Sequence, residues 1–94
     1  MNIEEMKQDT DVLGHIRTRN EERKRRAQEE GWTTFPLSES IADRFETVYD
    51  FEKDMALQTY SDVYKESRGF RPSIDPKWTL EEIRAKTERL YERA

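Results

Sequence analysis

The densest group of side chains that could bind a charged ligand is a basic run in the first third of the chain. Between Arg17 and Arg26 the sequence places six cations and two glutamates, a net charge of +4. The cations are Arg17, Arg19, Arg23, Lys24, Arg25 and Arg26. Side chains of this kind can contact the phosphates of a nucleic acid or a nucleotide. They can equally dock on an acidic protein surface, or pair with Glu21 and Glu22 one helical turn away as ordinary surface charge.

A second group combines aromatic side chains with one arginine in the last third of the chain. It consists of Tyr60, Tyr64, Phe70, Arg71 and Trp78. Tyr, Trp and Arg dominate binding hot spots, but such side chains can also form a small core around a turn. The Arg71 guanidinium can pair with Asp62 or reach a partner. From the two groups we predict a partner-binding surface made of Arg19, Arg23, Arg26, Tyr60, Tyr64 and Arg71. The alternative is a nucleic-acid-binding surface made of the six cations.

Few side chains are spaced for catalysis or for metal binding. The single histidine, His15, has Asp11 and Arg19 four residues away on either side, but no nucleophile motif accompanies it. Carboxylates from Asp43 to Asp54 follow helical spacing without the Glu-x-x-His pairs of metal-carboxylate bundles. The chain contains no cysteine. The sequence therefore predicts no catalytic residue, no metal site and no cofactor, and a protein that is not an enzyme.

Helices must position these groups, because apolar residues recur at the helical period and no alternating strand pattern is present. We predict a first helix over residues 3–30 that ends at Gly31. It begins with the capping box Asn2-x-x-Glu5, and Asp9 or Thr10 could cap a later helix start. A bend or break between Thr10 and Gly14 is compatible with this pattern, since a glycine in a helix interior costs about 1 kcal/mol relative to alanine.

Two further helices are predicted after Pro36. A long amphipathic helix over residues 39–67 is capped by Ser38 or Ser40 and stopped by Gly69. A last helix over residues 80–92 follows the capping box Thr79-Leu-Glu-Glu82, with Trp78 placed to pack on Ile83.

Length and composition limit how these helices can assemble. The chain has 94 residues, enough for one small domain, with 33% hydrophobic and 40% charged residues. The long middle helix carries more apolar surface than two neighbours of this composition can cover. We therefore expect an all-α domain of three helices, in a hairpin or open arrangement, completed by homo-oligomerisation. No basic leader and no apolar run of about 18 residues is present, so we expect a cytoplasmic protein without membrane contact.

One stretch resembles a known group of proteins. The segment Tyr60-Ser-Asp-Val-Tyr64-Lys65-Glu-Ser-Arg-Gly69-Phe70-Arg71-Pro72, followed by Trp78-Thr-Leu-Glu-Glu, is similar to small uncharacterised proteins of tailed bacteriophages that share a Tyr-Lys-x-x-x-Gly-Phe-Arg-Pro segment. The resemblance covers about residues 59–92 and implies a setting, the cytoplasm of the host bacterium, but no activity. By analogy with small phage accessory proteins, we expect a non-enzymatic protein that binds and inhibits or redirects a host or defence protein. A nucleic-acid or nucleotide binder is the alternative, and a structural virion component is the third interpretation.

Overall fold

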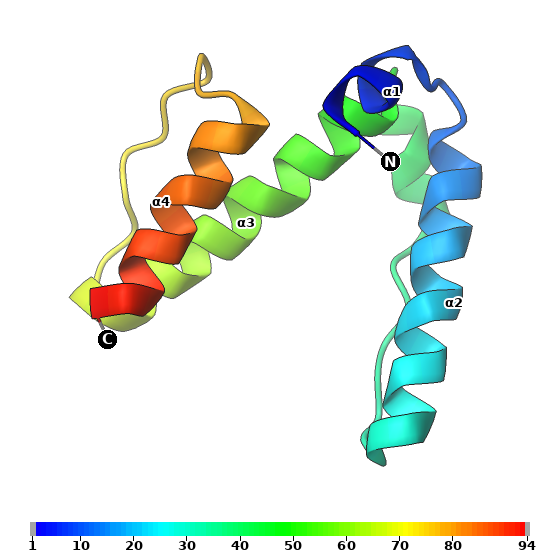
Figure 1. Cartoon of the computed structure of the whole chain (residues 1–94), viewed down its shortest axis with the longest axis horizontal. Coiled ribbons are helices and arrows are strands. Elements are labelled where there is room, and N and C mark those ends of the chain that lie inside the picture. Colours follow the sequence, from blue (N-terminus) through cyan, green and yellow to red (C-terminus); the bar gives the residue numbers. More distant parts are fainter. Residues whose placement is uncertain (1, 94) are drawn as a thin grey trace. The chain divides into compact units, whose positions relative to one another are not determined.

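The computed structural model of the chain describes residues 2–93, with side chains for residues 2–92 (Figure 1). Within this range the chain forms four α-helices and one 3-10 helix: α1 (Ile3–Gln8), α2 (Val12–Glu30), η1 (Glu39–Arg44), α3 (Val48–Arg68) and α4 (Leu80–Arg93). The all-helical class is confirmed, while the predicted count of three helices is corrected to five over the described residues. The helices belong to two compact units, Met1–Phe51 and Glu52–Ala94.

The predicted helix over residues 3–30 is interrupted, and the interruption has a local cause. Asn2 caps α1 as predicted, since its side-chain oxygen accepts a hydrogen bond from the Glu5 amide at 2.8 Å. A second cap then starts α2, where the Asp11 carboxylate accepts from the Gly14 amide at 3.0 Å. A side chain at position 14 would collide with that carboxylate, so the glycine makes room for the cap.

The predicted helix over residues 39–67 is wrong in its first nine residues. Residues 39–44 form the 3-10 helix η1, and the backbone is extended at Phe45, with φ of -126° and ψ of 137°. Helix α3 begins only at Val48, and the Thr47 hydroxyl accepts from the Asp50 amide at 3.2 Å. The Val48 amide donates to the Asp9 carbonyl at 2.9 Å, which ties the break between α1 and α2 to the start of α3.

The first unit has a small apolar core where these three helix ends meet. Its buried side chains near the ends are Met6, Val12, Ile16, Val48 and Phe51. The rings of Phe45 and His15 both pack edge-on against Phe51, each with a centroid separation of 5.7 Å. Complete burial of a side chain such as Phe51 contributes about 1.5 to 3 kcal/mol to the stability of the unit.

Helix α2 ends at a glycine, and the chain then returns along it. Gly31 adopts the left-handed conformation with φ of 76°, as predicted from its position. The Gly31 and Trp32 amides both donate to the Ala27 carbonyl, at 2.8 and 3.0 Å. Residues 32–37, here called the strap, run back beside the C-terminal half of α2 (Figure 1). The Asn20 side chain fixes the end of the strap, accepting from the Leu37 amide at 2.8 Å and donating to the Leu37 carbonyl at 3.1 Å.

The second unit packs most of α3 against α4, and the two helices run parallel rather than as a hairpin (Figure 1). Residues 69–79 return along α3, and Lys53 donates to the Pro76 carbonyl at 2.9 Å. The predicted capping box then starts α4, because the Thr79 hydroxyl accepts from the Glu82 amide at 3.2 Å. The core contains Tyr60, Ile83 and Leu90, with Ala56, Leu57, Val63, Tyr64 and Trp78 packed around them.

Candidate functional site

The predicted aromatic group is divided between core and surface in the second unit. Tyr60 is only 8% exposed, and its ring lies 5.8 Å from that of Trp78 and 5.9 Å from that of Tyr64. Burial raises the pKa of the Tyr60 hydroxyl above its ordinary value, and the neighbouring Tyr64 adds to the shift. The structure therefore places Tyr60, predicted as a partner-binding residue, in the core, and Tyr64 half-buried beside it.

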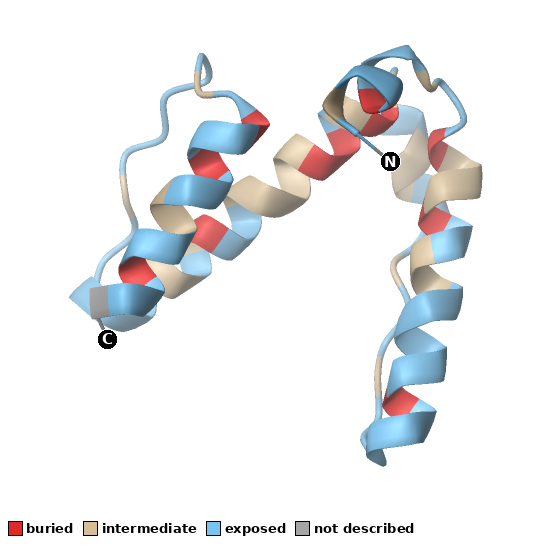
Figure 2. Ribbon diagram, in the orientation of Figure 1, coloured by how far each residue is buried: buried red, intermediate tan, exposed pale blue. Residues whose placement is uncertain are grey.

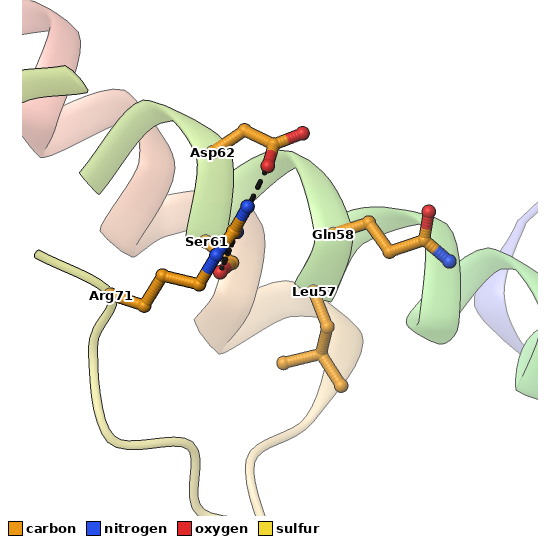
Figure 3. Close-up of a pocket in the computed structure, with 5 residues that line it drawn as sticks. All are labelled: Leu57, Gln58, Ser61, Asp62 and Arg71. Atoms are coloured by element: carbon orange, nitrogen blue, oxygen red, sulfur yellow. Dashed lines mark hydrogen bonds and ion pairs between the residues drawn. The ribbon is translucent and has the colours of Figure 1, made fainter. Parts of the chain in front are cut away.

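Arg71 braces the turn that leaves α3. Its guanidinium donates to the Ser61 hydroxyl at 2.8 Å and to the Asp62 carboxylate at 3.0 Å, the ion pair expected from the sequence (Figure 3). Leu57 and Gln58 complete the lining of a shallow open groove of about 350 Å³ on this side of α3. Both charged partners are more than half exposed, so the ion pair itself contributes at most about 1 kcal/mol.

Three large apolar side chains of the second unit remain uncovered. Phe70 is 60% exposed, Ile74 is 40% exposed and Tyr91 is 62% exposed. One edge of Phe70 packs on the Tyr64 ring at 5.6 Å, and the Arg68 guanidinium lies 5.6 Å from the same ring. Phe70 thus contacts Tyr64 on one side, while more than half of its side chain remains exposed.

In the first unit, the basic run is split by what its members contact. Arg17 pairs with Glu39 at 3.2 Å, and this hydrogen-bonded carboxylate raises the pKa of the Arg17 guanidinium. The Arg19 guanidinium lies 5.8 Å from the centre of the buried Phe51 ring. These two cations, both nominated from the sequence, therefore stabilise the unit.

The other four cations of the run, residues 23–26, are exposed. Over the described residues, none of them forms an ion pair or a hydrogen bond, and the predicted pairing of Glu22 with Arg26 is not formed. Arg23 and Lys24 share one helix face with Asn20 and Ala27, at positions i, i+3, i+4 and i+7. Because Asn20 binds the strap and Ala27 is buried at 5% exposure, this is the face along which the strap runs.

The strap adds two aromatic side chains to this part of the molecule. Phe35 is 82% exposed and Trp32 is 42% exposed, while the Trp32 indole donates to the Glu30 carboxylate. Figure 2 shows how little of the C-terminal half of α2 is buried. We call Arg23, Lys24, Trp32 and Phe35 the strap surface. Sequence reasoning nominated its cations but missed its aromatics, although a Trp and a Phe in a short connector before Pro36 were a usable signal.

A different set of charges occupies the rest of the α2 surface. Glu22, Arg25, Arg26 and Glu29 line a shallow depression of about 370 Å³ in which acidic and basic side chains alternate. The nominated residues Arg25 and Arg26 thus stand among carboxylates, whereas Arg23 and Lys24 stand on the face of the strap.

The described residues form neither a metal-binding cluster nor a membrane-spanning helix. Among the residues described, no three His, Asp or Glu side chains are grouped so that they could hold a metal ion. His15 lies against Phe51 in the first core. Within residues 2–93, none of the helices has both the length and the apolar character needed to cross a bilayer.

Comparison of the chain with known protein families, with curated proteins and with solved structures finds no significant match.

Proposed function

We propose that this protein acts by binding another protein, with no chemistry of its own, and that its target is a host or defence protein in a bacterial cytoplasm. The phage setting and the inhibitory or redirecting role follow from the resemblance of residues 59–92 to phage accessory proteins. What supports binding as the activity is the number of large side chains that the fold leaves uncovered.

The main supporting observation is that large aromatic side chains are exposed in both units. Phe35, Phe70 and Tyr91 are each at least 60% exposed. Each unit has fewer than 55 residues, so each can bury only a modest apolar area by itself. Aromatic and arginine side chains on the surface are the groups that contribute most to protein–protein affinity. The same surfaces could bind a second copy of the chain, as the sequence led us to expect.

Affinity capture tests this function directly. The full chain, carrying an affinity tag, would be expressed in a bacterial host and cross-linked before purification and mass spectrometry. We expect one host protein to be enriched over a tagged control, and the enrichment to fall when Phe35 and Phe70 are replaced by Ala. Recovery of nucleic acid without an enriched protein would contradict the proposal.

Self-association is measured separately by light scattering of the purified chain over a range of concentrations. A mass that stays at one chain up to about 100 μM would remove the homo-oligomer from the proposal, because dimers with the affinity of a typical transient interface form in that range.

A further inference from the structure

The strap surface has a composition that selects for one kind of ligand. It combines Arg23 and Lys24, which have no ion-pair partner among the described residues and share the α2 face of Asn20 and Ala27, with the exposed rings of Trp32 and Phe35 on the strap that runs beside this part of α2. Guanidinium and ammonium groups attract carboxylates or phosphates, and exposed rings accept an apolar side chain or a stacked base. The possible ligands are thus an acidic protein segment with an apolar anchor, or a single-stranded nucleic acid.

The charges around the strap surface decide between these two ligands. Glu21, Glu22, Glu29 and Glu30 lie on the same half of the helix, so residues 21–30 carry four cations and four carboxylates. The remainder of the first unit is more acidic, since residues 1–20 and 31–51 carry eight carboxylates and four cations, a net charge of -4. A nucleic acid carries a charge at every nucleotide and extends beyond a patch of two cations, so these carboxylates repel it.

A protein segment would meet less electrostatic repulsion at the same surface than a nucleic acid would. It can place one or two carboxylates opposite Arg23 and Lys24 while the rest of the segment carries no charge. An apolar side chain between those carboxylates can cover Phe35, which is otherwise 82% exposed to water. The Asn20 hydrogen bonds hold the strap at its far end and so limit how far its backbone can move before the ligand arrives.

We propose that the strap surface is the docking site for an acidic segment of the partner protein, in which carboxylates flank an apolar or aromatic residue. This inference rests on the proposed function and specifies the chemistry of the target. It assigns the contact to Arg23, Lys24, Trp32 and Phe35, and leaves Arg25 and Arg26 outside it.

The test uses the full chain and a short fluorescein-labelled peptide in which one Glu and one Asp flank a single Phe and the other residues are uncharged. Fluorescence anisotropy at low salt would give its affinity. Arg23→Glu with Lys24→Glu should weaken binding at least about tenfold, because both cations face the peptide. The matched control is Arg25→Glu with Arg26→Glu, which makes the same change in net charge on the same helix and should alter the affinity by less than about threefold.

A second pair of variants keeps the test valid if the charge reversals disturb α2. Phe35→Ala removes a side chain that supports no core and should weaken binding at least about fivefold. Phe70→Ala is its control, since it removes an exposed ring of the other unit and should leave peptide affinity unchanged. Trp32 gives an independent readout, because its fluorescence should change on binding and this change should be absent in Trp32→Phe.

Each remaining outcome contradicts the inference in a defined way. Equal weakening by the two charge reversals would show non-specific attraction, and no peptide binding would remove the site. Tighter binding of a single-stranded oligonucleotide with the same number of charges would assign the surface to nucleic acid instead. Any of these results would leave the proposed function standing if the full chain still captured a protein, whereas a chain that captured none would fail that proposal whatever the peptide did.

Discussion

At the scale of single residues, Asn20 connects helix α2 to the strap, a role that no sequence pattern indicated. Its amide makes two hydrogen bonds to the backbone of Leu37, and both groups are partly buried. An Asn in the middle of a helix is normally read as a neutral surface residue, because what its side chain contacts depends on a segment 17 positions away.

We predict that Asn20→Ala releases the strap from α2. Two part-buried backbone groups would lose their partner, at a cost of about 1 to 2 kcal/mol. Amide hydrogen exchange by NMR should show much faster exchange at Leu37, with little change in the core around Phe51. Gln28→Ala, which removes an exposed amide from the same helix, is the control. A Leu37 amide that stays as protected as in the unmodified chain would argue against this role.

Tyr60 is the residue for which the structure gives a pH dependence. Its folded-state pKa is raised by burial above the ordinary value near 10, so the neutral hydroxyl is favoured by folding. This contribution to stability is complete below the unfolded pKa and is lost as pH rises through the folded pKa. We therefore expect urea unfolding, followed by circular dichroism, to show a smaller loss of stability from pH 8 to above pH 10 in Tyr60→Phe than in the unmodified chain. Identical losses would show that the pKa of Tyr60 is the same in the folded and unfolded states.

The candidate site was only partly predictable, and the reason is visible in individual residues. Residue type identified cations that the structure leaves exposed, since Arg23 and Lys24 were among those nominated. Type alone cannot separate them from Arg17 and Arg19, which contact Glu39 and Phe51 at sequence separations of 22 and 32. Residue type likewise cannot decide whether Tyr60 belongs to the core or to a binding surface, because its burial depends on α4.

At the scale of helices and connectors, local signals located ends better than interiors. The capping box at Thr79, the glycine end at Gly31 and the stop at Gly69 all stand where the sequence predicted them. The missed boundary before Val48 had a signal of its own, since Thr47 and Asp50 have the spacing of a capping pair. It was overridden because apolar periodicity continued through it. The parallel packing of α3 and α4 was missed because it depends on how residues 69–79 return, which no local pattern encodes.

The two halves of helix α2 differ in how many of their side chains are buried against the rest of the unit. Val12 and Ile16 are buried in the N-terminal half, whereas Ala27 is the single buried side chain among residues 20–30. Helical segments of this length are marginal in water without packing. Amide exchange should therefore be at least about tenfold faster for residues 22–28 than for residues 15–19. Uniform protection along α2 would indicate that the strap stabilises the C-terminal half of the helix as strongly as the core stabilises its N-terminal half.

At the scale of the whole molecule, the division into two units places two small cores in one chain. The first is built around Phe51 and the second around Tyr60 and Ile83. Sequence periodicity could not predict this division, because α3 runs through it as one helix and supplies both Val48 and Tyr60. Each unit is below the size at which a single apolar core normally gives several kcal/mol of stability.

Because the two cores are separate, we expect the amides of each unit to lose protection independently of the other unit. Tyr60→Ala removes a buried ring, a change that costs about 3 to 5 kcal/mol, and should expose the amides of α4 to exchange. The amides around Ile16 should keep most of their protection, because their contacts lie in the first unit. Phe51→Ala should give the converse pattern, and Tyr91→Ala, which removes a 62% exposed ring, should affect neither. If both core variants exposed all amides to exchange equally, the chain would unfold as one cooperative body and the binding surfaces of both units would be lost together. Separate exchange patterns would instead mean that one unit can stay folded, with its binding surface intact, while the other unfolds.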